Sequence, residues 1–191
     1  MMISKIQTKG EKEKKRKQNQ LIVGGVMIFL LVLSTAGFSL LSSGDNNSNS
    51  EYKDNGFKFY SEGGYFATEI SGQVYRFKYL PSQVTDVEIE GEYDLNSYIG
   101  QPIYFVGETS VASEILVNLQ SFVLRYQEAC LEGGECSNEE LPVKTCSDNL
   151  IVYKNNNAEQ TKIYKEENCV FMEGDLTKAS NAFVYKLLRV I

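Results

Sequence analysis

Aromatic and polar residues alternate along residues 57–79, a pattern typical of β-strands, whose side chains point to opposite faces in turn. Three runs separated by glycine-containing turns, 56–60, 65–70 and 73–80, predict an antiparallel meander that stops at Pro81. One face of the meander would carry the aromatic side chains, namely Phe57, Phe59, Phe66, Tyr75, Phe77 and Tyr79. Aromatic stripes on strands are far more often core than ligand platforms, so we assign this face to the core.

A second alternating segment, 86–94, places a carboxylate at every even position. As a strand it would line up five acidic side chains on one face: Asp86, Glu88, Glu90, Glu92 and Asp94. This acidic surface could be a cation site or a docking surface for a basic partner. We favour a solvated strand face, because its charge would discourage edge-to-edge pairing and because calcium ligands usually come from a tight loop.

The next segments alternate between strand and helix patterns. Residues 102–107 predict a short buried strand. Ser110 then precedes an apolar stripe of helical period over 111–131, which Gly133 and Gly134 end. In this predicted helix, water would face the polar positions Glu114, Asn118, Gln120, Arg125 and Gln127.

The last part of the chain predicts a strand over 145–153, a turn over 154–157, and one or two strands over 160–164 and 169–172 that return across the first. Asp175 is suited to cap a final amphipathic helix. The fold class is therefore α+β, an antiparallel β-meander followed by a β-α-β-β-α segment.

Ahead of this domain, Leu21–Leu41 contains no charged residue and is long enough to cross a bilayer as a helix. We expect a transmembrane helix that contacts the lipid bilayer and remains in the mature protein. The alternative is a signal peptide cut near Ala36, because Ser34-Thr35-Ala36 supplies small residues after an apolar core. In that case the domain would be secreted.

Charge assigns the two sides of this segment. Residues 1–20 carry seven basic and two acidic side chains, which leaves 12 basic and 23 acidic residues in the rest of the chain, a net charge of −11. A basic flank marks the cytoplasmic side, so we expect the acidic domain outside. We divide the chain into a basic tail (1–20), the membrane segment (21–41), a polar flexible tether (42–54) and an extracytoplasmic domain (55–191). An acidic domain disfavours nucleic acid as a partner.

Four cysteines lie in the predicted outer domain: Cys130, Cys136, Cys146 and Cys169. An even number in an oxidising compartment favours two disulfides. Three pairings are possible, and we prefer Cys130 with Cys136 and Cys146 with Cys169. Zinc would favour paired C-x2-4-C spacings, and a redox site would favour C-x-x-C; neither spacing occurs.

No residue can be assigned to catalysis, to a cofactor or to a metal from the sequence. The chain has no histidine, no G-x-S-x-G elbow, no P-loop and no dinucleotide fingerprint. We therefore expect a membrane-anchored envelope protein that binds a protein or envelope component or has a structural role there. An anchored envelope hydrolase or thiol redox enzyme is the alternative.

Three short segments carry a resemblance: Asn55-Gly56-Phe57-Lys58-Phe59, Asn168-Cys169-Val170 and Tyr185-Lys186-Leu187-Leu188. With the overall layout, they make the chain resemble uncharacterised single-pass membrane proteins of small-genome archaea. The resemblance spans the outer domain loosely. It implies a membrane-anchored outer domain and no specific activity, so it assigns no functional residue.

Overall fold

The computed structural model describes residues 20, 22–28, 30, 50–136, 138–154 and 158–191. They belong to two compact units, Met1–Ser48 and Asn49–Ile191. In the first unit, residues 20, 22–28 and 30 are helical. The described residues include no helix that is both long enough and apolar enough to cross a membrane. Most of the predicted transmembrane segment, 21–41, lies outside the described residues.

The second unit begins with the predicted meander, which is confirmed and has one more strand than expected. Its strands pair antiparallel in the order β1 (Glu51–Asp54), β2 (Phe57–Glu62), β3 (Tyr65–Ile70) and β4 (Gln73–Phe77). Strand β1 comes from the end of the segment that we predicted as a tether. It pairs because Tyr52 lies opposite Phe59 and sets its ring edge-on to Phe66, 5.4 Å between centroids, which extends the aromatic face.

A second sheet of six strands has the order β5-β11-β12-β10-β6-β7. Its members are β5 (Glu88–Ile89), β6 (Pro102–Gly107), β7 (Arg125–Glu128), β10 (Leu150–Lys154), β11 (Lys162–Glu166) and β12 (Cys169–Glu173). Strands β12, β10, β6 and β7 are parallel, and β11 is antiparallel to β12. The central strands are continuous apolar runs such as Leu150-Ile151-Val152-Tyr153, because both of their faces are covered.

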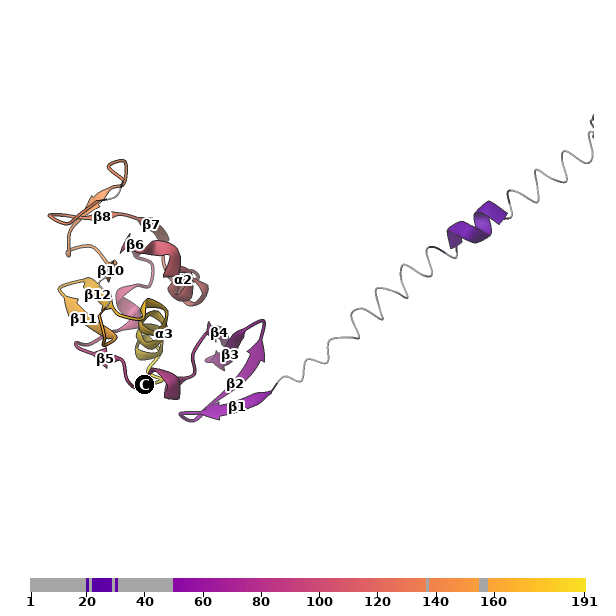
Figure 1. The fold of residues 1–191 in the computed structure, drawn as a ribbon, viewed down its shortest axis with the longest axis horizontal. Helices are drawn as coiled ribbons and strands as arrows, with labels where there is room; N and C mark the ends of the chain where they lie inside the picture. The colour runs from indigo at the N-terminus through magenta and orange to yellow at the C-terminus, as the bar shows by residue number, and fades with distance from the viewer. Residues whose placement is uncertain (1–19, 21, 29, 31–49, 137, 155–157) are drawn as a thin grey trace, which may run out of the picture. The chain divides into compact units, whose positions relative to one another are not determined.

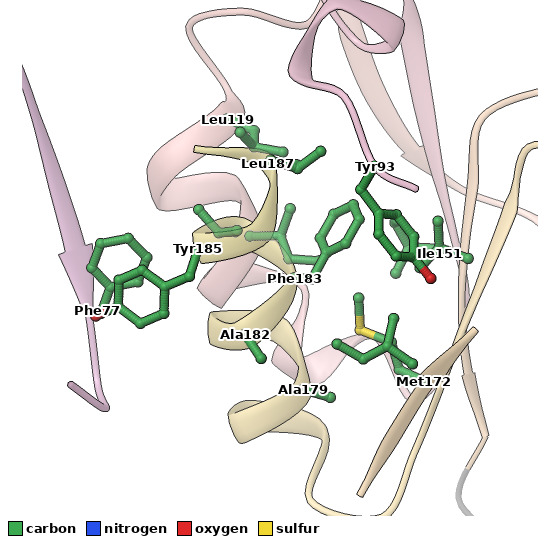
Figure 2. Packing of buried hydrophobic residues seen from close by; sticks show 14 of the residues in the cluster. Phe77, Tyr93, Leu119, Ile151, Met172, Ala179, Ala182, Phe183, Tyr185 and Leu187 are labelled. Carbon is green, nitrogen blue, oxygen red and sulfur yellow. The ribbon is translucent and has the colours of Figure 1, made fainter. Parts of the chain in front are cut away.

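In the second unit, the helices α2 (Ser113–Leu119) and α3 (Leu176–Leu187) form a layer between these sheets (Figure 1). Tyr185 of α3 stacks on Phe77 of the meander at 3.9 Å, and Phe183 faces Tyr93 and the six-stranded sheet (Figure 2). The predicted cap is confirmed, since the Asp175 carboxylate accepts a hydrogen bond from the Lys178 backbone amide. The helical layer therefore joins both sheets into one core.

The predicted long helix over 111–131 is wrong. Residues 109–111 form the 3-10 turn η3 (Thr109–Val111), α2 ends at Leu119, and the chain then forms β7 and the short strand β8 (Cys130–Leu131). Residues 125–128 are exposed and pair with the free edge of β6. The helical period of the segment is realised only in the two turns of α2. Beyond them, backbone pairing with β6 outweighs the helical pattern. Strand β8 pairs with β9 (Val143–Lys144) in a two-stranded sheet.

The expectation that Glu114 and Asn118 face water is also wrong, because α2 lies inside the middle layer and both side chains are at most 2% exposed. The Asn118 side chain accepts from the Arg76 amide and donates to the Arg76 carbonyl, each at 2.8 Å. Asn181 of α3 accepts from the next amides of the same edge, Lys78 and Tyr79. The two asparagines thus satisfy backbone groups at the β4 edge of the meander, as a neighbouring strand would.

Candidate functional site

A pocket of about 670 Å³ opens where the parallel strands β6 and β10 end. Its floor is apolar and consists of Val106 on β6, Val152 on β10 and Phe171 on β12, the face of the sheet turned away from the helices. Parallel strands bring their carboxyl ends to one edge of a sheet, and this edge is where open α/β sheets commonly bind ligands. The size is within the range of small-molecule sites.

The segment that follows β7 forms a wall of the pocket beside this floor. Ala129, Cys130 and Leu131 line it, and the chain returns past Leu141 after a loop that the Cys130–Cys136 disulfide closes. Two backbone hydrogen bonds stabilise this segment internally. The Cys130 amide donates to the Pro142 carbonyl, and the Gly134 amide donates to the Leu131 carbonyl. The disulfide and these bonds hold the loop over the apolar floor.

Gly107 controls how the chain leaves β6 at the rim of the pocket. Its φ is +89°, and a Cβ there would lie 2.1 Å from the carbonyl oxygen of Tyr153 on β10. Only glycine combines this backbone conformation with such a close approach. The turn brings Glu108 and Thr109 to the rim, where the Thr109 hydroxyl donates to a carboxylate oxygen of Glu128 at 2.7 Å.

Three carboxylates line the pocket: Glu108, Glu128 and Glu135. All three residues are exposed. None of them forms an ion pair with a lysine or arginine in the described part of the chain, whereas Glu51, Glu62, Glu90 and Glu114 do. The rim therefore carries negative charge that the neighbouring described side chains do not neutralise.

Lys154 is the basic residue that lines the pocket, and its charge is already engaged. Its ammonium lies 3.4 Å from the Glu173 carboxylate and 4.7 Å from the centroid of the Phe171 ring. It also donates a hydrogen bond to the Tyr164 hydroxyl, which in turn donates to Glu173 at 3.0 Å. The bond to Tyr164 is the main cause that raises the pKa of Lys154 above its ordinary value. The side chain therefore remains a cation at neutral pH.

The segment 86–94 does not form one strand, although all five of its acidic residues are exposed. Strand β5 includes only Glu88 and Ile89, and Gly91, at φ +101°, turns the chain soon after it. Asp86 pairs with Lys178 at 2.7 Å, a bond that lowers the pKa of Asp86, and Glu90 pairs with Lys162 at 2.8 Å. Asp94 caps the 3-10 helix η2 (Leu95–Ser97), and exposed Glu92 lies in the turn between.

The described residues do not group three His, Cys, Asp or Glu side chains in a way that could hold a metal ion. Among the acidic residues of 86–94, Asp86 and Glu90 form ion pairs with lysines and Asp94 caps η2. The segment thus contributes surface ion pairs and a cap.

Both predicted disulfides are confirmed, Cys130–Cys136 and Cys146–Cys169, and they leave no free cysteine. The second pair links the residues ahead of β10 to the first residue of β12, two neighbouring parallel strands. The first pair closes the wall of the pocket, a role that its spacing alone does not reveal. No pattern in the sequence predicted the pocket, although a glycine at the end of a buried strand, Gly107, is the kind of signal that marks such an edge.

Comparison of the chain with protein-family models, with curated proteins and with solved structures gave no match.

Proposed function

We propose that this protein is a ligand-binding protein of the cell envelope, held at the membrane by Leu21–Leu41. Its extracytoplasmic domain takes up a ligand in the pocket at the ends of β6 and β10. The observation that carries the proposal is the pocket itself, an apolar floor of Val106, Val152 and Phe171 with a few polar groups at its rim. Cavities of this composition and size are typical of binding sites. The anchor and its orientation rest on the uncharged segment and its basic flank.

A pocket-filling substitution tests the binding function. Leu141 lines the pocket and is half-buried, so Leu141→Trp would fill part of the cavity with the larger indole. The matched control is Val74→Trp, because Val74 is 46% exposed on the meander and lies outside the pocket. We expect ligands found by screening a fragment and peptide library against the full chain in neutral detergent to lose binding to Leu141→Trp alone. Ligands that bind both variants equally would contradict the proposal.

The anchor has its own test. Mass spectrometry of the mature N-terminus would show a retained membrane segment if the protein begins upstream of Leu21. A mature chain that begins at Gly37 would indicate cleavage after Ala36 and a secreted domain.

One contact supports a second candidate, an anchored hydrolase. The Thr109 hydroxyl donates to Glu128 at 2.7 Å, the arrangement of a nucleophile beside a base. If this pair were catalytic, Thr109→Val would abolish turnover of acyl or glycosyl reporter substrates while leaving ligand binding in place. Equal activity of the variant and the wild type would remove this candidate.

A further inference from the structure

We propose that the pocket binds a lysine or arginine side chain from an extended segment of a partner protein. This inference rests on the proposed binding function and names the chemical class of its ligand. Its basis is the combination of an apolar floor with a rim of carboxylates that form no ion pair within the described part of the chain.

The floor sets the first requirement. Val106, Val152 and Phe171 present only a small apolar surface at the floor, and the half-buried side chains of Leu131 and Leu141 add to it, so a ligand that enters covers apolar surface. A favourable ligand therefore has an apolar body. The aliphatic stem of lysine or arginine provides one and leaves its charged end at the rim.

The rim sets the second requirement. Glu108, Glu128 and Glu135 line the pocket and form no ion pair with any described lysine or arginine, and the positive charge of Lys154 is offset by Glu173 at 3.4 Å. An anionic ligand would be repelled by these carboxylates, whereas an ammonium or guanidinium group would be attracted and hydrogen-bonded. The rest of the domain adds to this preference, since the chain beyond residue 20 has a net charge of −11.

Lys154 shows how a basic side chain is held at this site. Its ammonium lies between a carboxylate and two aromatic rings, 4.7 Å from the centroid of Phe171 and 5.1 Å from that of Tyr164. The two rings stack at 5.0 Å and present their faces to the cation. A second basic side chain from a partner would meet Phe171 at the floor of the pocket and the carboxylates of Glu108, Glu128 and Glu135 at its rim.

The size of the pocket favours a peptide over a small free amine. A volume of about 670 Å³ exceeds what one basic side chain fills, so the neighbouring backbone of the partner would also be covered. Burial of this additional surface gives a peptide an advantage that a short alkylammonium ion lacks.

Three blocked pentapeptides with a central lysine, norleucine or glutamate among alanines test the inference, with n-butylammonium as the free cation. Binding to the full chain in neutral detergent is followed by NMR or calorimetry. We expect the lysine peptide to bind at least about tenfold more tightly than the norleucine peptide, which has the stem without the charge. We also expect this preference to shrink as salt is added, because exposed charges are screened.

Substitutions of the rim carboxylates test whether they cause the preference for the lysine peptide. Glu108→Gln combined with Glu128→Gln should remove most of the lysine preference, and glutamine at 128 can still accept the Thr109 hydroxyl bond. Glu69→Gln, at an exposed carboxylate of β3, serves as the matched control and should change nothing. Near-UV circular dichroism checks that each variant folds.

The outcomes separate the two proposals. A norleucine or glutamate peptide that binds as well as the lysine peptide, and loses binding to Leu141→Trp, would overturn the basic-ligand inference and support the binding function. A preference for n-butylammonium over the lysine peptide would overturn the peptide as ligand. Lysine-peptide binding that Leu141→Trp leaves unchanged would overturn the inference by placing the ligand outside the pocket. If none of the probes binds, the inference is overturned, and the library screen decides on the binding function.

Discussion

Replacing Asn118 with alanine should destabilise the domain by about 2–4 kcal/mol. Asn118 is 1% exposed, and its amide group makes two hydrogen bonds of 2.8 Å to the backbone of Arg76 at the edge of β4. Alanine would leave both backbone groups without their partner, and an orphaned buried group costs about 1–3 kcal/mol. We take the lower half of the summed range because Arg76 is half-buried and water can reach part of this edge.

Urea unfolding monitored by near-UV circular dichroism measures this loss, since the chain has twelve tyrosines and no tryptophan. With an m-value of about 2 kcal/mol per molar urea, the midpoint should fall by about 1–2 M at unchanged slope. Asn118→Asp keeps the acceptor for the Arg76 amide. It loses the donor and adds a charge near Glu114, so its loss should be at least as large.

Asn96→Ala is the matched control for this prediction. Asn96 is exposed in η2, so its removal should cost less than about 0.5 kcal/mol. A loss below about 1 kcal/mol for Asn118→Ala would refute the reasoning, because it would mean that water replaces the asparagine at the β4 edge without penalty.

Three further predictions concern the disulfide, the glycine turn and the tyrosines. Converting Cys146 and Cys169 to serine should lower the free energy of unfolding by about 3 kcal/mol, from loop closure over 23 residues, measured by urea unfolding with and without reductant. Gly107→Ala should destabilise by more than about 2 kcal/mol, because its Cβ would lie 2.1 Å from a backbone oxygen of β10; an unchanged midpoint would contradict this close approach. In an alkaline titration of the folded protein, Tyr104 should ionise at a lower pH than a free tyrosine, because the Arg125 hydrogen bond lowers its pKa, and Tyr104→Phe should remove this early phase.

The buried tyrosines also determine the direction in which stability changes at high pH. Burial raises the pKa of Tyr98, Tyr153 and Tyr185 well above the ordinary value of 10.0. Their neutral forms therefore contribute stability that is complete below that value and is lost as pH rises through the folded-state pKa. The urea midpoint should fall steadily above pH 10. A midpoint that is constant there would contradict the burial of these hydroxyls.

The sequence predicted the elements whose signals are local. The aromatic alternation of 57–79 gave the meander, and Asp175 marked the start of α3, because side-chain period and capping depend on neighbouring residues. The two preferred disulfides were confirmed, out of the three pairings that the four cysteines allow.

The predictions that were wrong concern structure that depends on residues far apart in the chain. The segment 111–131 has a helical period, yet residues 125–128 pair with β6. One or two strands over 160–164 and 169–172 were expected to return across the strand at 145–153. In the sheet, β12 is parallel to β10 and lies between β10 and β11, an order that no local pattern encodes. The pocket could not be predicted for the same reason. Glu108, Glu128 and Glu135 come from three segments that converge only when β6, β7 and β10 align.

The position of α3 in the middle layer has a consequence for the order in which the domain folds during synthesis. The meander is made first, yet its aromatic face packs on Tyr185, whose hydroxyl donates to the carbonyl of Tyr79, 106 positions earlier in the chain. Until α3 has been made, Phe59 and Phe77 lack this ring, and the part of the apolar face that they form stays exposed. Native folding of the first strands therefore waits for the last helix.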